Sequence, residues 1–459
     1  MKYTLLVFLF FYSLCMNAQV TYEKIYGNNS DYETGNSLIV KSDTEYVFTG
    51  VNQNFPPGSG SAYLMKVNQF GDTVFTKSYP IFSEGNSVQS TFDGGYIITG
   101  RYDTIQNGSD FIYLIKTNAV GDTDWTRTYL QGGAYSVKQT PDSGYILAGN
   151  AVIKTSTSGD TLWTRDSLSS FPDFFYSIDL TPDSGLVLFG ERINGNAIDA
   201  EFVKLNRLGD TLWIKYFDGG GFDIGKSVKL INGGTFILAA TTFDTLNFKK
   251  VIWIIKTNDF GDSIWSKKIS GIDDYEVNDV SQTNDGGFIL TGDVYNSSTN
   301  EGDLLLIKTD SLGDVKWTKT FSHNYNDEGK SVRQTSDGGY IIVGNTDNIV
   351  TSGEWDIYLI KTDSLGNIDS TITNTYNFPI SENKITIFPN PAINYFVINN
   401  LMTEETVLLQ ISDLIGQTIY EDNLFGKSKY IVDLYLPKGI YFVNIKNGET
   451  HSTKKLIIE

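Results

Sequence analysis

Side chains that could bind a sugar or a protein surface recur together in the variable segments of the sequence. In these segments aromatic residues stand beside carboxylates, as Tyr102 does beside Asp103 and Phe222 beside Asp223. An aromatic ring can stack on a sugar, and a carboxylate can accept hydrogen bonds from its hydroxyl groups. The aromatic residues that we place on one candidate ligand face are Tyr102, Phe222, Tyr275, Tyr325 and Trp355.

The same segments leave two other interpretations open. A pair of carboxylates on these loops could hydrolyse a glycosidic bond, which needs a defined separation between the two groups that a sequence does not give. Alternatively, the segments are ordinary polar loops with scattered aromatic residues. We therefore name no catalytic residue.

Other catalytic and metal chemistry has little support in the composition. The chain has two histidines, His323 and His451, one cysteine, Cys15, and no GxSxG motif, which leaves too few ligands for a His/Cys metal site. Turns such as Asn68 to Asp72 offer two acidic or amide side chains each, whereas calcium takes six to eight oxygens. A glycine-containing hairpin turn explains them as well. We expect no cofactor, with calcium as the weaker alternative.

A repeated β-hairpin must position these segments. The stretch Asp303 to Phe321 has an apolar run, a lysine, a turn with glycine and an alternating strand that contains a tryptophan, a pattern typical of a hairpin. The same lysine, glycine and aromatic recur as Lys66/Gly71/Phe75, Lys116/Gly121/Trp125, Lys154/Gly159/Trp163, Lys204/Gly209/Trp213 and Lys256/Gly261/Trp265. A seventh copy, Lys361/Gly366, has Ser370 in the aromatic position. A lysine that repeats in every copy indicates a structural role, such as pairing with a turn aspartate.

Two further strands precede each hairpin, so each repeat has four strands. The second strand follows an acidic or asparagine turn and ends in a small residue, at Gly50, Gly100, Gly149, Gly190, Ala239, Gly292 and Gly344. A period of about 50 residues built of four strands is typical of a β-propeller, here with seven blades. The third repeat is shortened near Asn150 to Val152.

The N-terminal end of the repeat region should complete the ring. The fourth strand of the seventh repeat lacks its aromatic, whereas the segment Tyr22 to Tyr26 aligns with Phe75 to Tyr79 and puts Tyr22 in the tryptophan position. We expect residues 20–373 to form the propeller, closed by this N-terminal strand, which removes exposed sheet edges.

The N-terminus indicates an extracytoplasmic protein. Residues 1–19 have one lysine, an apolar stretch from Leu5 to Tyr12 and Ala18 near the end, as a secretory signal peptide does. A lipoprotein signal at Cys15 and a membrane anchor are the alternatives; the apolar run is short for a span, so we expect no transmembrane segment in the mature chain. A net charge of −19 disfavours nucleic acid as a partner.

The pattern changes after the seventh repeat. Residues 374–381 read as a linker, and residues 382–459 as alternating strands broken by Pro, Gly and Asn, which suits a small Ig-like β-sandwich. The fold class that we predict is therefore all-β, a seven-bladed β-propeller followed by that sandwich.

The tail resembles the C-terminal sorting domain of the type IX secretion (Por) system of Bacteroidetes. The residues that carry the resemblance are Pro389, Asn390, Pro391, Gly416, Gly439, Tyr441, Lys454 and Lys455. The resemblance implies export by the type IX machinery, removal of the domain, and release or attachment to surface lipopolysaccharide. A plain Ig-like binding module is the alternative. The repeats also resemble those of quinoprotein-like propellers, a resemblance that concerns the fold and not the cofactor.

Together these features predict a secreted or surface-anchored, monomeric binding or adhesion propeller, with a glycan or a protein as its ligand. The alternative is an extracellular glycoside hydrolase or lyase that uses carboxylates on the loop face.

Overall fold

The structure is a computed structural model, and it describes most of the chain. The described residues are 19–368 and 386–458, apart from 28–31, 54–59, 82, 105–108, 167, 169–172, 196, 232, 297, 300, 324, 325, 348–354, 389–394, 400–406, 414–416, 425–428, 434, 435, 448 and 449. The predicted signal peptide, apart from Gln19, and the predicted linker lie outside these residues. The chain divides into two compact units, Met1–Thr373 and Asn374–Glu459.

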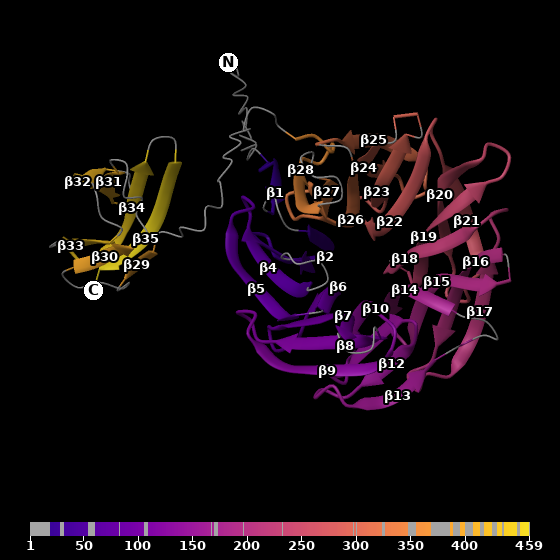
Figure 1. The fold of residues 1–459 in the computed structure, drawn as a ribbon. Coiled ribbons are helices and arrows are strands. Elements are labelled where there is room, and N and C mark those ends of the chain that lie inside the picture. Colours follow the sequence, from indigo (N-terminus) through magenta and orange to yellow (C-terminus); the bar gives the residue numbers. More distant parts are fainter. Residues whose placement is uncertain are drawn as a thin grey trace, which may run out of the picture. The chain divides into compact units, whose positions relative to one another are not determined.

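The first unit contains seven antiparallel four-stranded sheets arranged in a ring, the blades of a propeller (Figure 1). Blade 1 contains β2 (Tyr32–Ser42), β3 (Glu45–Gln53), β4 (Ser61–Asn68) and β5 (Thr73–Ile81). Blade 2 contains β6 (Ser83–Ser90), β7 (Tyr96–Thr104), β8 (Ser109–Thr117) and β9 (Thr123–Gln131). Blade 3 contains β10 (Ala134–Gln139), β11 (Tyr145–Gly149), β12 (Val152–Thr155) and β13 (Thr161–Arg165).

The next three blades follow the same strand order from the centre outwards. Blade 4 contains β14 (Asp173–Leu180), β15 (Leu186–Asn194), β16 (Ala197–Leu205) and β17 (Thr211–Phe217). Blade 5 contains β18 (Asp223–Ile231), β19 (Thr235–Asp244), β20 (Lys249–Thr257) and β21 (Ser263–Ile269). Blade 6 contains β22 (Asp274–Gln282), β23 (Phe288–Asn296), β24 (Glu301–Thr309) and β25 (Val315–Phe321).

Blade 7 joins the two ends of the repeat region. It contains β26 (Asp327–Gln334), β27 (Tyr340–Asp347) and β28 (Trp355–Thr362), and its outer strand is the N-terminal β1 (Tyr22–Tyr26). Tyr22 lies opposite Lys361, the register in which Trp265 lies opposite Lys256 in blade 5. The ring is thus closed by hydrogen bonds between strands from opposite ends of the unit.

The hydrophobic core lies in the seams between blades rather than at the centre of the ring. Each of seven buried clusters combines side chains of two neighbouring blades, and these clusters join every adjacent pair, including blades 7 and 1. This is why each sheet needs apolar residues on both faces, since a blade packs against a neighbour on each side.

In five blades the hairpin lysine pairs with an aspartate on the turn between the first two strands, and in blade 1 Lys66 pairs with Glu45 instead. In blade 6, Lys308 Nζ lies 2.8 Å from Asp285 Oδ2, on the turn between the first two strands. The same aspartate accepts hydrogen bonds from Thr283 Oγ1 and Gly287 N, so it also shapes the turn. Equivalent pairs are Lys116 with Asp93, Lys154 with Asp142, Lys204 with Asp183 and Lys361 with Asp337. These contacts fit the structural role that the repetition predicts.

The second unit has two sheets that share one core. One sheet has the order β29 (Thr386–Phe388), β30 (Tyr395–Asn399) and β33 (Lys429–Asp433). The other has the order β32 (Thr418–Leu424), β31 (Val407–Ser412), β34 (Gly439–Asn447) and β35 (Thr450–Ile458). Phe396 and Ile398 of the first sheet pack with Leu409 and Val443 of the second, as in a β-sandwich. In the part of the chain that is described, no helix has the length and apolarity that a membrane span requires.

Candidate functional site

The four-stranded blades give the propeller two faces. We call upper the face that carries the connections from the second to the third strand of each blade and from each blade to the next. The lower face carries the connections from the first to the second and from the third to the fourth strand. Strands in a blade alternate in direction, so all connections of one kind lie on one side. Because the upper connections vary most in length, they are where a specific site is expected.

The structure spreads the predicted ligand-face residues over the upper ends of several blades. Tyr102, in blade 2, lies 5.4 Å from the Tyr113 ring and packs partly against the core of blades 1 and 2. Tyr275 packs similarly against the core of blades 5 and 6, and Trp355 is half-buried at the start of β28. Phe222, between blades 4 and 5, is 53% exposed. Tyr325 lies outside the described residues, so of these five side chains Phe222 is the one that can offer an open aromatic surface here.

Phe222 borders a cavity on the upper face, which we call the upper pocket. Its volume is about 270 Å³, and it is lined by Ile198, Phe222, Ile224, Thr241, Phe243, Lys250 and Glu276. Phe222 is held in place because its carbonyl accepts a hydrogen bond from Phe243 N at 3.1 Å. Gly221 permits this approach, since an added Cβ would stand 2.3 Å from the Phe243 carbonyl oxygen. The lining is mostly aliphatic and aromatic, with charge at one edge.

The charged edge of the upper pocket is an ion pair between neighbouring blades. Lys250 Nζ of β20 donates to Glu276 Oε1 of β22, and Lys250 N donates to Asp274 Oδ1 at 2.8 Å. Lys250 and Glu276 therefore neutralise each other, and the edge of the pocket carries no unpaired charge from these two residues. Apart from Phe222, the sequence did not indicate these lining residues, because five separate strands and one connection bring them together.

Asp293 is a perturbed carboxyl group beside this edge. It lies directly across the strand pair from Glu276. Burial, followed by the charges of Glu276 and Glu328, raises its pKa to about 7. In blade 7 the same position holds an amide, and Asn345 donates to Glu328 at 2.7 Å, whereas blade 4 has Glu191 there. Blade 6 thus places an acid where blade 7 places an amide, and a carboxyl group whose pKa is strongly raised beside a second carboxylate is a candidate functional group.

Two tyrosines also mark the upper mouth of the central channel. Tyr135 and Tyr176, on the inner strands of blades 3 and 4, have ring centroids 5.1 Å apart, and Lys226 Nζ lies 4.7 Å from the Tyr176 ring. The matching position holds Asn36, Asn86 and Asn278 in three other blades, whose amides bond the backbone of the next blade. The sequence signal that could have found them is therefore a change from asparagine to tyrosine in the repeat.

The other predicted candidates have structural surroundings. The turn oxygens proposed for calcium are used locally, since Asn68 Oδ1 accepts from Phe70 N and Asp72 N and Asp72 pairs with Lys24. His323 is exposed on the connection to blade 7. Among the described residues, no group of three or more His, Cys, Asp and Glu side chains is arranged to hold a metal.

The described part of the sorting motif lies in the second unit. Gly439 and Tyr441 belong to β34, where the Tyr441 ring joins the core and its hydroxyl donates to the Pro437 carbonyl at 2.7 Å. Lys454 and Lys455 lie on β35, opposite Val443 and Phe442. Pro389, Asn390, Pro391 and Gly416 lie outside the described residues.

Comparison with known proteins identifies the second unit. Residues 386–459 match the family model described as "Secretion system C-terminal sorting domain". The protein therefore carries a sorting domain of the type IX secretion system, and it is a β-propeller protein that this system secretes to the cell surface or beyond it. The sorting domain also implies an interaction with the secretion machinery. No curated protein matches the chain.

Solved structures similar to this chain are distant from it. A protein of unknown function from Bacteroides caccae is 14% identical, with 62% of this chain and 97% of that chain covered and a TM-score of 0.41. The β-propeller domain of the Trilobed protease from Pyrococcus furiosus is 10% identical, with 76% and 99% covered and a TM-score of 0.43. At TM-scores below 0.5 these similarities support no inference about function.

Proposed function

We propose that this secreted propeller is a monomeric binding or adhesion module whose upper pocket receives an apolar side chain of a protein ligand. The observation that carries the proposal is the upper pocket itself, about 270 Å³, with Phe222 at its rim and the Lys250–Glu276 pair at its edge. An apolar pocket bordered by a few polar groups is the usual form of a specific binding site. The exposed Phe222 ring adds the type of residue that dominates interface energetics.

The chemistry of the lining favours a protein over a glycan. A sugar presents hydroxyl groups that lose hydrogen bonds to water and need replacements in the site. Here Thr241 is buried, and the two charged groups already bond each other. An aliphatic or aromatic side chain has no such requirement, and burying it gives about 1.5–3 kcal/mol.

A direct screen tests this proposal. The full chain is applied to a random-peptide library and to a glycan array, and retained ligands are sequenced or identified. We expect enrichment of peptides that share one apolar anchor, next to polar positions complementary to Lys250 and Glu276. Selection of glycans alone would replace the protein ligand by a sugar, and retention of neither would contradict the binding function.

One observation favours an enzyme as the second candidate. Asp293 has a pKa of about 7, and the neighbouring Glu276 is a carboxylate, the kind of pair that glycoside hydrolysis uses. Glu201 also has a raised pKa, about 8, but it is completely buried and cannot reach a ligand. A panel of chromogenic glycosides, with Asp293→Asn as the inactivated variant, tests this candidate. Turnover that Asp293→Asn abolishes would support hydrolysis, whereas absence of turnover on every glycoside would remove its support.

A further inference from the structure

A ring of small polar side chains surrounds the channel at the centre of the propeller. The inner strands of six blades contribute Ser37, Ser87, Ser136, Ser177, Ser227 and Ser331. Several of these hydroxyls accept a hydrogen bond from a backbone N–H of the next blade, for example from Val137 N to Ser87 Oγ at 3.3 Å and from Val228 N to Ser177 Oγ at 3.1 Å. The ring thus links blade to blade around the axis.

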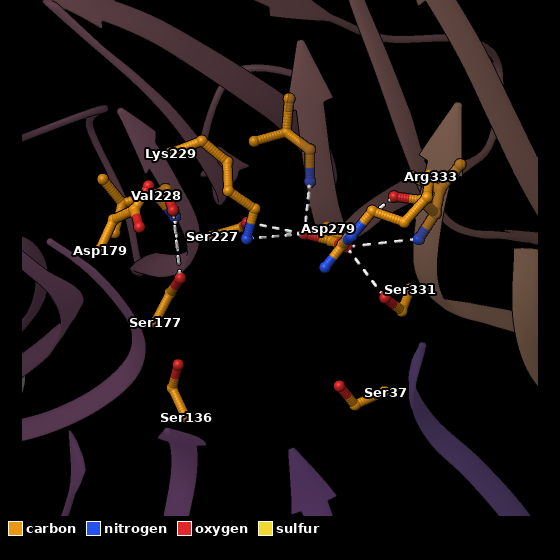
Figure 2. Close-up of polar contacts among 12 residues, drawn as sticks. Ser37, Ser136, Ser177, Asp179, Ser227, Val228, Lys229, Asp279, Ser331 and Arg333 are labelled. Carbon is orange, nitrogen blue, oxygen red and sulfur yellow. Dashed lines mark hydrogen bonds and ion pairs between the residues drawn. The ribbon is translucent and has the colours of Figure 1, made fainter. Parts of the chain in front are cut away.

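Blade 6 breaks this ring with Asp279, which stands where the others have serine (Figure 2). Its carboxylate accepts from Ser227 Oγ at 2.8 Å, from Ser331 Oγ at 3.1 Å and from Val280 N at 3.0 Å. Arg333 Nη1 approaches Asp279 Oδ2 to 2.5 Å, whereas Lys229 Nζ remains 3.4 Å from Asp279 Oδ1. The carboxylate is therefore well supplied with donors, and Lys229 is its most distant partner.

Two residues further along the inner strands lies a cavity that we call the axial cavity. Its volume is about 290 Å³, and it is lined by Ile39, Val40, Gln89, Lys138, Lys229, Ser281, Arg333 and Gln334. These residues come from six of the seven inner strands, towards the lower face. The axial cavity is therefore distinct from the upper pocket.

Positive charge is in excess around the axial cavity. Among the described residues, three cationic side chains lie here, Lys138, Lys229 and Arg333. They face two carboxylates, those of Asp179 and Asp279. Asp179 is occupied on both oxygens, by Leu180 N at 3.1 Å and Leu230 N at 2.7 Å, in addition to Lys138 at 3.2 Å. A net charge of −19 for the whole chain does not account for a cationic cavity on its axis.

The cations also oppose one another. Burial lowers the pKa of Lys229, and the charges of Arg333 and Lys138 lower it further against the opposite effect of Asp279 and Asp179. An anion placed between these groups would relieve that repulsion and accept charge-assisted hydrogen bonds from them. The Gln89 amide and the Ser281 hydroxyl add neutral donors to the same lining.

We propose that the axial cavity binds a small oxyanion, with Lys229, Arg333 and Lys138 as its charged ligands. Phosphate, sulfate and carboxylate groups share the required chemistry, which is several oxygen acceptors on a compact negative group. This site does not depend on the function of the upper pocket, and it lies towards the other face of the ring.

Calorimetric titration of the full chain tests this site. Phosphate, sulfate and succinate are titrated separately at constant ionic strength, with chloride as the background anion. We expect saturable binding of one anion per chain. Lys229→Gln should weaken it at least tenfold, whereas Lys229→Arg, which keeps the charge, should retain it. The oxyanion that binds most tightly shows which of the three groups, phosphate, sulfate or carboxylate, the axial cavity prefers.

Two further variants separate a binding site from a structural ion network. Lys215→Gln removes a lysine that pairs with Asp262 at 2.7 Å on the outer rim, and it should bind as the wild type does. Asp279→Ser gives blade 6 the residue of the other blades and removes one negative charge, so it should tighten anion binding. Thermal melts confirm that each variant is folded. Lack of saturation with all three anions, or equal weakening in Lys229→Gln and Lys215→Gln, would overturn the proposal.

Discussion

The indole of Trp265 lies against Gly313 of the next blade, so closely that a Cβ added to Gly313 would stand 2.8 Å from Cη2 of the ring. Beside this contact, Lys267 Nζ lies 2.8 Å from Asp314 Oδ1. The contact recurs around the propeller, and Tyr22 of β1 takes the same place against Gly71. The glycine of each turn thus serves the preceding blade as well as its own hairpin.

Substitution of Gly313 should destabilise the propeller through this seam. Gly313 has φ +80°, so Gly313→Ala carries the backbone cost of a positive φ, about 1–2 kcal/mol, and a clash with Trp265 of about 1–3 kcal/mol. Gly286→Ala is the matched control, because Gly286 also has φ +80° and its added Cβ would meet no described atom within 4 Å. Urea denaturation of both variants measures the difference. Equal losses would show that the Trp265 contact contributes nothing.

The closing strand should tolerate tryptophan and not alanine. Tyr22 is half-buried and stands in the position that holds Trp265 in blade 5, so Tyr22→Ala should cost about 2 kcal/mol, below the roughly 3–5 kcal/mol of a fully buried aromatic. Tyr22→Trp should lie within about 1 kcal/mol of the wild type. Thermal unfolding compares the two. A loss with tryptophan as large as that with alanine would mean that β1 packs differently from the other outer strands.

Sequence reasoning could reach the repeat architecture because its signals are local. The lysine, the turn glycine and the aromatic lie within ten residues of one another. In five blades the lysine pairs with a turn aspartate, and around the ring the aromatic covers the glycine of the next blade. The same logic applies to Tyr22, whose alignment with Phe75 corresponds to the register opposite Lys361 and Lys66.

The candidate site was much harder to predict, because its residues are distant in the sequence and come together only when neighbouring blades pack in the ring. Phe222 was singled out, but Lys250 and Glu276 are neighbours only because blades 5 and 6 pack together. Asp279 could have been noticed as a departure from the serine of the other blades, and Asp293 as an acid at the position that Asn345 has in blade 7. That comparison needs the inner strands aligned position by position, and a bulge in these strands shifts the register near Asp279.

Acid should weaken the turns that hold the buried lysines. Partial burial would raise the pKa of Asp285, but hydrogen bonds from Lys308, Thr283 and Gly287 outweigh it and lower the pKa to about 2 from 3.8. The stability that this carboxylate contributes is therefore present above about pH 4 and is lost as the pH falls towards 2. Asp93 and Asp183 have pKa values of about 2 for similar reasons.

The substitution Asp285→Asn isolates this effect. Lys308 is 7% exposed and would lose its counter-ion, which should cost about 1–2 kcal/mol near pH 7 and flatten the fall in melting temperature between pH 4 and 2. Asp262→Asn, which breaks a more exposed pair with Lys215, should have a smaller effect. Melting curves from pH 2 to 7 measure the contribution of the Lys308–Asp285 pair. An Asp285→Asn variant as stable as the wild type at pH 7 would contradict a stabilising role of this pair.

Asp293 should show the opposite dependence on pH. Its pKa is raised from 3.8 to about 7, so between these values the folded chain holds a proton that the unfolded chain releases, and stability falls as the pH rises through this window. Asp293→Asn removes the penalty and supplies an amide that can donate to Glu276. We expect the variant to be more stable at pH 8 by at most about 4 kcal/mol, since the pKa rises from 3.8 to about 7 and one pKa unit corresponds to about 1.4 kcal/mol. An Asn variant less stable than the wild type at pH 8 would refute this account.

The most direct test of the binding function compares two apolar residues of the upper face. Phe222 lines the upper pocket, whereas Leu246, 88% exposed on the connection between β19 and β20, is not among the lining residues. The affinity of the full chain for the peptides retained in the library screen is measured for Phe222→Ala and Leu246→Ala. Because a central aromatic anchor contributes about 2 kcal/mol or more, Phe222→Ala should weaken binding at least tenfold while Leu246→Ala binds as the wild type does. Unchanged affinity in Phe222→Ala would contradict the assignment of the upper pocket as the binding site.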